Sequence, residues 1–198
     1  SIVQKNYHYV ENLPYSEKAK YYLATQIELD KALELLLDKL EKNNRLDDTV
    51  ILLIGDHYPF GLTLDEMNEL STYERDNTFE KTKMPLIIYN SEINNQSVDK
   101  YCSNLDILPT ILNLYGIEYD SRLLLGKDIF SSSESTIIFH NRSFITNRGK
   151  YNSLMPIFGE SLTEEYANQI KDEIYYKFKI SRLILENDYY KYLKDQLE

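Results

Sequence analysis

The tripeptide Gly55-Asp56-His57 brings together the residue types in this chain that are best suited to chemistry. Hard and borderline divalent cations accept a carboxylate oxygen together with an imidazole nitrogen, a pair that suits manganese or zinc better than calcium. In a straight strand Asp56 and His57 would point to opposite faces. They can share one cation only if the backbone turns here, and Gly55 makes that turn easier. The alternative is that Asp56 caps a loop and His57 is a hydrogen-bonded surface residue.

The other groups that could bind or react carry weaker signals. His8 and His140 are the only further histidines, and we expect them at solvated loop and sheet positions. The carboxylates within residues 65–76 form a charge-rich stretch typical of a solvated surface. A single cysteine, Cys102, excludes an internal disulfide and the paired-cysteine zinc sites. The sequence also lacks a P-loop, a dinucleotide-binding glycine pattern and a nucleophile elbow.

The tripeptide directly follows an apolar run, TVILLIG at residues 49–55, which predicts a strand buried on both faces. Such strands are usually parallel, and PLIIY at residues 85–89 predicts a neighbouring strand. In open α/β sheets, ligands bind beyond the carboxyl ends of the strands. The carboxylate and the imidazole therefore follow the strand at the place where a binding site is expected.

Two helices are predicted before and after these strands. Apolar residues at helical spacing predict a long amphipathic helix from Tyr15 to Asn44, with Ser16 as its N-cap. A second helix is predicted to have Asp106 as its N-cap and to end near Gly116. A proline in its first turn is tolerated there, because no hydrogen bond is lost.

The last part of the chain predicts short strands and then a helix. TIIFH at residues 136–140 and SFIT at residues 143–146 have strand composition, and a turn follows at residues 147–150. Apolar residues four apart predict a helix from residue 163 to about 192, with a break near Asn187-Asp188. The predicted fold class is α/β: a mostly parallel sheet flanked by helices, with a small late β-hairpin and a helical C-terminal tail.

The composition is that of a folded acidic domain. Hydrophobic residues make up 42% of the 198 residues and charged residues 27%, an ordinary globular balance. A formal charge of -10 makes nucleic acid an unfavourable partner. No apolar run approaches the roughly 20 residues that cross a bilayer, and residues 1–9 do not form a signal peptide. The opening residues read as mid-chain loop, so we expect a preceding part of the same protein.

Three longer segments resemble a known family. YLATQIELDKALELLLDKLEKNNRLDDTVILLIGDHYPFGL is similar to the long helix, strand and metal-binding Asp-His of lipoteichoic acid synthase-like proteins in the sulfatase and alkaline phosphatase superfamily. SNLDILPTILNLYGIEYDSRLLLGKDIFS resembles the Asp-x-x-Pro-Thr helix and Gly-Lys-Asp loop of that family, and IIFHNRSFITNRGKYN resembles its late strands. The resemblance covers roughly residues 21–152, whereas the helical tail matches only loosely.

The resemblance implies a metalloenzyme fold of which this chain holds one part. It predicts that residues 1–198 are the C-terminal portion of a sulfatase-like catalytic domain, with a core at about 15–152 and a helical tail at about 160–198. In the family a divalent cation activates a Thr or Ser nucleophile that attacks a phosphate or sulfate ester. Only Asp56 and His57 carry over as metal ligands, with manganese as the expected cation and zinc or magnesium as alternatives.

The same resemblance places the remaining machinery outside this chain. The nucleophile, an early acidic ligand and the substrate-binding histidine and arginine lie upstream of the matching segments. No catalytic residue is therefore assigned here, and we expect the 198 residues alone to bind metal poorly and to be inactive. The intact parent is expected to be a membrane-anchored enzyme on the extracytoplasmic face of a bacterial cell membrane, whereas the 198 residues themselves are expected to be soluble.

The expected substrate is a phosphate or sulfate ester of a phospholipid or polymer, with glycerol phosphate moving from a lipid donor to a polymer or to water. Two alternatives stay open. The parent could be a sulfatase, a phosphoethanolamine transferase or a phosphomutase of the same superfamily, which the identity of the nucleophile would decide. The chain could also be a non-catalytic interaction module of the cell envelope, because a fold does not guarantee a function.

Overall fold

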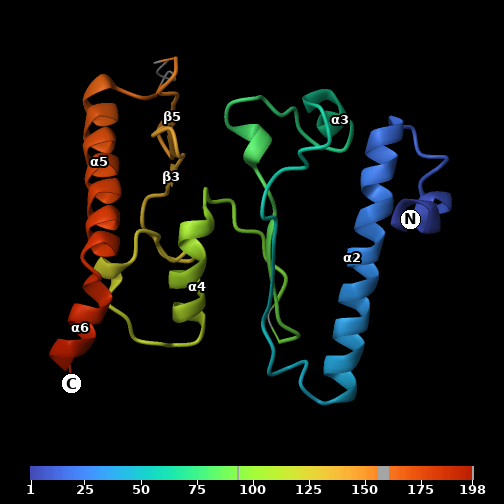
Figure 1. Cartoon of the computed structure of the whole chain (residues 1–198), viewed down its shortest axis with the longest axis horizontal. Helices are drawn as coiled ribbons and strands as arrows, with labels where there is room; N and C mark the ends of the chain where they lie inside the picture. The colour runs from blue at the N-terminus through green and yellow to red at the C-terminus, as the bar shows by residue number, and fades with distance from the viewer. Residues whose placement is uncertain (93, 156–160, 198) are drawn as a thin grey trace. The chain divides into compact units, whose positions relative to one another are not determined.

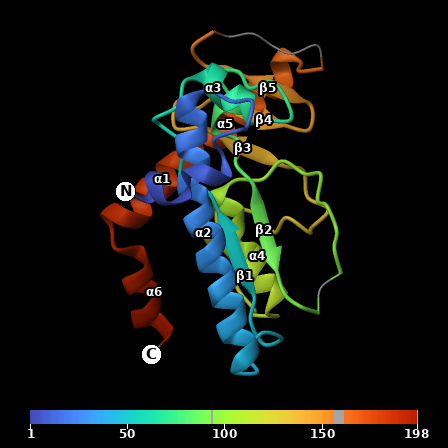
Figure 2. The same ribbon diagram turned by 90° about the vertical axis from the view of Figure 1, so that its right-hand side faces the viewer.

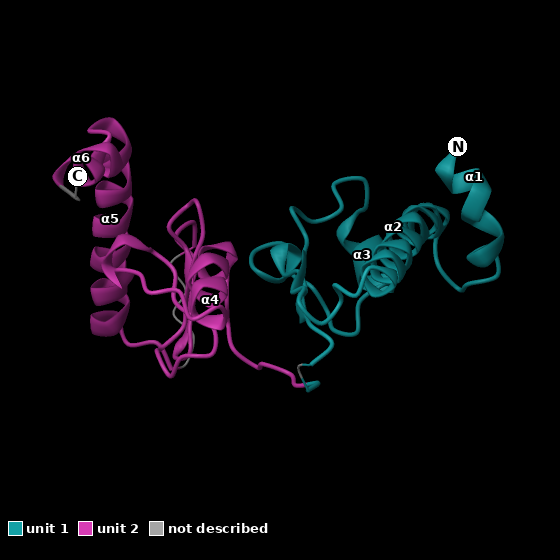
Figure 3. Cartoon of the chain, turned by 90° about the horizontal axis from the view of Figure 1, so that it is seen from below, with its two compact units in different colours: residues 1–95 teal, residues 96–198 magenta. Residues whose placement is uncertain are grey.

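The computed structural model describes residues 1–92, 94–155 and 161–197, and the chain divides into two compact units (Figures 1 and 3). Unit 1 comprises residues 1–95 and unit 2 comprises residues 96–198. The elements of unit 1 are α1 (Ile2–Asn6), η1 (Tyr7–Tyr9), α2 (Glu17–Lys42), β1 (Ile51–Ile54), α3 (Leu64–Glu69), η2 (Glu80–Thr82) and β2 (Leu86–Tyr89). Those of unit 2 are η3 (Asn104–Asp106), α4 (Ile107–Leu114), η4 (Ser121–Leu123), β3 (Thr136–Ile138), β4 (Phe144–Thr146), β5 (Gly149–Tyr151), α5 (Glu164–Glu186) and α6 (Tyr189–Leu197). None of the described helices is long and apolar enough to cross a lipid bilayer.

The long helix of unit 1 is confirmed as α2, with Ser16 at its N-cap position. The short helix α1 lies beside it (Figure 2), and the buried side chain of Asn6 joins the two. Its amide nitrogen donates to the Ala24 carbonyl at 3.1 Å and to a Glu28 carboxylate oxygen at 2.7 Å. Its amide oxygen accepts from the Lys31 ammonium at 3.0 Å. Loss of any one of these partners would leave the buried amide group without one of its hydrogen bonds, which lowers the free energy of unfolding.

The expected parallel sheet is wrong for the described residues. Strands β1 and β2 pair antiparallel, with Ile51 opposite Tyr89 and Ile54 opposite Leu86, and every other described pairing is also antiparallel. The apolar run correctly predicted a strand, but periodicity does not reveal the direction of its neighbour. Burial on both faces is likewise not observed, since Ile54 is 41% exposed and Ile87 is 51% exposed.

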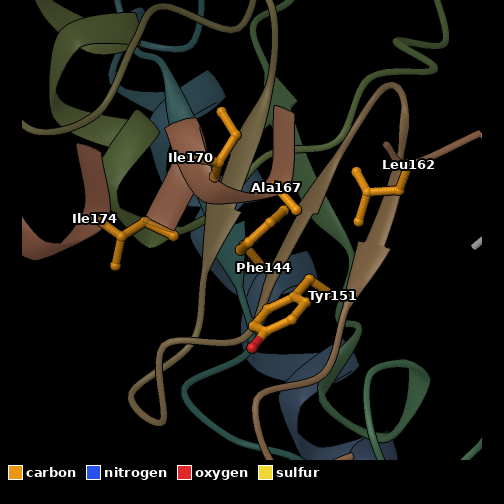
Figure 4. Packing of buried hydrophobic residues seen from close by; sticks show 6 residues of the cluster. All are labelled: Phe144, Tyr151, Leu162, Ala167, Ile170 and Ile174. Carbon is orange, nitrogen blue, oxygen red and sulfur yellow. The ribbon is translucent and has the colours of Figure 1, made fainter. Parts of the chain in front are cut away.

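The late strands and α5 form the main hydrophobic core of unit 2. Strands β3, β4 and β5 make an antiparallel meander, so the two predicted strands are confirmed and a third follows them. Gly149 opens β5 with a φ of +147°, a backbone conformation that suits glycine. Phe144 lies at the centre with no exposed surface, and its ring stacks on Tyr151 at 5.1 Å. The buried cluster, shown in Figure 4, consists of Phe144, Tyr151, Leu162, Ala167, Ile170 and Ile174.

The C-terminal helical prediction is confirmed as two helices. Thr163 caps α5 by accepting a hydrogen bond from the Tyr166 amide. The predicted break is present: Asn187 is the C-cap, and Asp188 adopts a φ of +46° before α6 begins. Residue 160, the predicted start of the tail, lies outside the described residues. Whether the tail and core belong to one catalytic domain stays a prediction.

The predicted helix after Asp106 is confirmed as α4, with its end near Gly116. The Asp106 carboxylate does not cap this helix but accepts from the Ser103 amide at 2.7 Å and from the Lys127 amide at 2.7 Å. The buried Thr110 hydroxyl donates to the Asp106 carbonyl at 2.6 Å and accepts from the Ile129 amide at 3.1 Å. Hydrogen bonds thus join the Asp-x-x-Pro-Thr motif at residues 106–110 to the loop that carries the Gly-Lys-Asp motif at residues 126–128. We refer to these two joined segments as the clasp.

Gly126 is the tightest point of this clasp, because a Cβ atom there would overlap the Leu105 carbonyl oxygen. We predict that Gly126→Ala lowers the free energy of unfolding of unit 2 by about 1–3 kcal/mol, since main chain rather than a flexible side chain must move. Urea denaturation followed by the fluorescence of the tyrosines measures this change. Gly61→Ala, in unit 1, is the control for an added methyl group in open space, since a Cβ there meets nothing within 4 Å, and it should leave the unfolding of both units unchanged. Equal effects of the two substitutions would contradict the interpretation that residue 126 must be glycine for the loop to approach Leu105.

Candidate functional site

The backbone bends at Asp56 and His57 immediately after β1. This is the turn that two neighbouring ligands require if they are to face one cation. Gly55 precedes the bend, and a Cβ atom there would lie 2.6 Å from the Met84 sulfur. The condition that the sequence analysis set for a shared cation, a change of backbone direction at this position, is therefore met.

The bend brings the two side chains together. The nearest distance between the ionisable groups is 3.5 Å, from His57 Nε2 to Asp56 Oδ2. The other carboxylate oxygen, Asp56 Oδ1, accepts from the His57 main-chain amide at 2.8 Å. Both side chains are open to solvent, at 87% exposed for Asp56 and 49% for His57. A carboxylate oxygen and an imidazole nitrogen thus face each other at an accessible position.

The imidazole of His57 is oriented by two further contacts. Its Nδ1 lies 2.7 Å from the Tyr58 carbonyl oxygen, and because that oxygen can only accept, Nδ1 carries the proton. Its ring stacks on Phe60 with centroids 4.1 Å apart and planes 7° apart. Phe60 in turn meets the Tyr58 ring edge to face at 4.8 Å. Together these contacts leave Nε2 as the nitrogen that can bind a ligand.

This arrangement fits a divalent cation in its donor types and in its supporting contacts. Metal-bound histidines commonly donate the other ring N–H to a main-chain carbonyl, as His57 does to Tyr58. Asp56 and His57 supply only two donors. Across the described ranges, no group of three or more His, Cys, Asp or Glu side chains could hold a metal. The metal-ligand role of the pair stays a prediction, and further donors must come from elsewhere.

Neighbouring carboxylates have structural partners, in agreement with the prediction that they form a surface. Glu66 closes a capping box with Thr63, whose main-chain amide lowers the pKa of the Glu66 carboxyl. Glu69 accepts from the Ser16 main-chain amide at 2.6 Å. Asp76 Oδ1 accepts from the amides of residues 78–80. The remaining histidines, His8 and His140, lie exposed in η1 and in the turn after β3.

A family model described as Sulfatase matches residues 4–117, which is more than half of the chain. The chain belongs to the sulfatase family. The matching residues include β1, the bend with Asp56 and His57, and the clasp residues of α4. The resemblance inferred from the sequence is therefore confirmed at the level of the family.

Within the sulfatase family, the curated relatives of this chain include lipoteichoic acid synthases. Lipoteichoic acid synthase 2 of Bacillus subtilis is 27% identical over 174 residues, which cover 81% of this chain and 26% of the relative. The lipoteichoic acid synthase of Staphylococcus saprophyticus is 34% identical over 137 residues, which cover 66% of this chain and 21% of the relative. The chain thus spans about a fifth to a quarter of the length of these relatives.

A solved structure supports the fold. The lipoteichoic acid synthase LtaP from Listeria monocytogenes has a TM-score of 0.63 and 22% sequence identity, covering 81% of this chain and 44% of that chain. The chain therefore has an α/β fold of the sulfatase type, and the parallel direction expected for its strands is the part that needed correction.

The aromatic support of His57 was missed by the sequence reasoning. Phe60 and Tyr58 flank the histidine closely, and Lys81 places its ammonium 4.5 Å from the centre of the Tyr58 ring. The nearby Tyr58 and Phe60 were a visible signal, because an aromatic ring within a few residues of a loop histidine can stack on it. The contact from Lys81 depends on the path of the chain between β1 and β2 and left no sequence signal.

We predict that neutral His57 is protonated at Nδ1 rather than at Nε2, because the Tyr58 carbonyl accepts from Nδ1. Long-range proton–nitrogen NMR at about pH 8.5, where an ordinary imidazole is neutral, distinguishes the two tautomers. The signals are assigned with His57→Gln, and the exposed His140 serves as the internal control. A proton at Nε2 of His57 would contradict the described orientation of the ring.

Proposed function

We propose that this chain supplies two ligands of the divalent-cation site in a lipoteichoic acid synthase-like phosphotransferase. The observation that supports this proposal most directly is the bend after β1, which sets Asp56 Oδ2 and His57 Nε2 3.5 Å apart in a member of the sulfatase family. Manganese is the proposed cation, with zinc and magnesium as alternatives, since carboxylate and imidazole donors suit a borderline ion.

In this proposal each residue of the bend has a separate role. A bound divalent cation supplies positive charge that lowers the pKa of a hydroxyl nucleophile and offsets charge on the phosphate oxygens. Asp56 contributes the negative charge of the ligand pair, and His57 contributes a neutral nitrogen donor. The Tyr58 carbonyl holds the Nδ1 proton, so that Nε2 keeps its lone pair for the cation. The Phe60 ring limits rotation of the imidazole.

The substrate and the remaining machinery are part of the same proposal. A Thr or Ser nucleophile, an acidic ligand and the groups that bind substrate would belong to the large part of the relatives' length that this chain does not match. The proposed reaction moves glycerol phosphate from a lipid donor to a growing polymer at the extracytoplasmic face of a bacterial membrane. The names of the relatives support this substrate, because they are lipoteichoic acid synthases.

In the intact parent protein, we predict that Asp56→Asn and His57→Gln each lower manganese-stimulated transfer of glycerol phosphate by about 100-fold or more, because each removes a ligand. Turnover of a labelled lipid donor measures the loss. Asp65→Asn and His140→Gln are matched controls with the same chemical changes at exposed positions, and they keep their activity. Full activity in both ligand variants would refute the proposal.

In the 198-residue chain alone, we predict weak manganese binding centred on the bend and no turnover, because two ligands do not complete a site. Paramagnetic Mn²⁺ should broaden the NMR signals of Asp56 and His57 at concentrations that leave those of His8 unchanged. Asp56→Asn should abolish this selectivity. Uniform broadening of all histidines would instead favour a non-catalytic interaction module of the same fold.

A further inference from the structure

Unit 2 contains a small hollow that the function proposed above does not use. It is lined by residues 100–102 and Asp106, by residues 125, 127–129 and 133–136, and by Lys177 on α5. Its volume is about 20 Å³, which is room for one water-sized group. Three of the lining side chains are lysines, namely Lys100, Lys127 and Lys177. We refer to it as the lysine hollow.

The three ammonium groups retain hydrogen-bond donors. An ammonium has three donors, and within the described part of the chain none of these lysines forms an ion pair with a carboxylate. Each donates one hydrogen bond to a main-chain carbonyl oxygen: Lys100 to Ser131 at 2.7 Å, Lys127 to Glu134 at 2.9 Å and Lys177 to Leu125 at 3.3 Å. Donors on all three groups are thus available to a ligand.

The carboxylates that line the hollow are engaged by other donors. Asp106 accepts from Ser103 and from the Lys127 main-chain amide as part of the clasp. Asp128 accepts hydrogen bonds from the Phe130 main-chain amide and the Asn113 side chain. Glu134 accepts hydrogen bonds from the side chains of Arg148 and Tyr166. These contacts orient the carboxylates without neutralising the lysines by direct pairing.

Lys177 is in an environment that disfavours its positive charge. Burial and, next, the charge of Lys127 lower the pKa of the Lys177 ammonium, and the nearby carboxylates of Glu173 and Asp106 only partly offset this. A negatively charged ligand between Lys127 and Lys177 would relieve the repulsion that remains.

Ser135 gives a second and independent indication of a ligand. Ser135 lines the hollow and is only 4% exposed, and its buried hydroxyl has no hydrogen-bond partner among the described residues. A buried hydroxyl without a partner is destabilising, so native proteins usually satisfy it with water or a ligand. The hydroxyl donates one hydrogen bond and is therefore suited to an anionic oxygen.

We propose that the lysine hollow binds a single phosphate group. One phosphate oxygen enters the hollow and accepts from the Ser135 hydroxyl, which turns toward the hollow on binding because its oxygen has almost no exposed surface in the free chain. The outer oxygens accept from the ammonium groups of Lys100, Lys127 and Lys177. The small volume leaves room inside the hollow for one oxygen of the phosphate group. Lysine binds phosphate as a point charge and needs no planar geometry. The phosphate could be free or could end a lipid headgroup.

The first experiment titrates the folded 198-residue chain with inorganic phosphate and follows amide NMR signals. We expect saturable shifts at residues 127, 135 and 177, and Lys177→Gln should weaken binding about tenfold through the loss of a charge-assisted hydrogen bond. Lys179→Gln is the matched control, because it removes the same charge from an exposed position of α5. Its affinity should stay within about twofold of the wild type. Equal weakening in both variants, or no saturation, overturns the proposal.

Ser135→Ala separates a ligand contact from a structural role. Removing an unpartnered hydroxyl should leave the melting temperature unchanged or raise it, whereas phosphate affinity should fall about threefold through the lost hydrogen bond. Circular dichroism confirms that the variant is folded. An unchanged affinity for phosphate in folded Ser135→Ala would show that the hydroxyl faces a water molecule only, and would overturn the assignment.

Sedimentation with lipid vesicles identifies the source of the phosphate. Phosphatidylcholine vesicles that contain phosphatidic acid present terminal phosphates, and pure phosphatidylcholine vesicles are the control. Sedimentation that requires phosphatidic acid and Lys177 assigns the hollow to a lipid headgroup. Phosphate binding without sedimentation assigns it to a free phosphate. Either result supports the proposal, and failure of both overturns it while leaving the Asp56 and His57 proposal untouched.

Discussion

The hydroxyl of Thr110 is the contact on which the arrangement of unit 2 depends most. It donates to the Asp106 carbonyl and accepts from the Ile129 amide, and so fastens the loop at residues 125–131 to the start of α4. Gly126 lets the same loop approach Leu105 closely. The loop held in this way contributes residues 127–129 to the lining of the lysine hollow. Two motifs that are separate in the sequence are thereby one structural feature.

In unit 1 the corresponding constraint is conformational. In a straight strand, neighbouring side chains point to opposite faces. The bend after β1 changes the direction of the backbone, so that the side chains of Asp56 and His57 point toward each other. Main-chain groups then fix both side chains, since the His57 amide binds the carboxylate and the Tyr58 carbonyl binds the imidazole. The pair is both exposed and preorganised, so a cation can reach it while further donor groups complete the coordination.

The sequence predicted the helices well because their signals are local. The N-cap position of Ser16 and the break at Asn187-Asp188 follow from residue type and apolar spacing, and the metal-ligand candidates followed from position after a strand. The direction of β2 did not follow, because pairing depends on a connection of some thirty residues with its own folded turns. The hydrogen bond from the Lys127 amide to Asp106 was equally hidden, since it joins segments that are separated by about twenty residues.

The pair of strands in unit 1 also determines how this stretch of chain would behave by itself. Among the described residues, β1 and β2 pair only with each other, so each strand has an outward edge of main-chain groups beside apolar side chains such as Ile54 and Ile87. A two-stranded ribbon is marginal in water, and such edges are templates for strand addition. Edge-to-edge association between molecules is the expected consequence in concentrated solution, and a covering strand would suppress it.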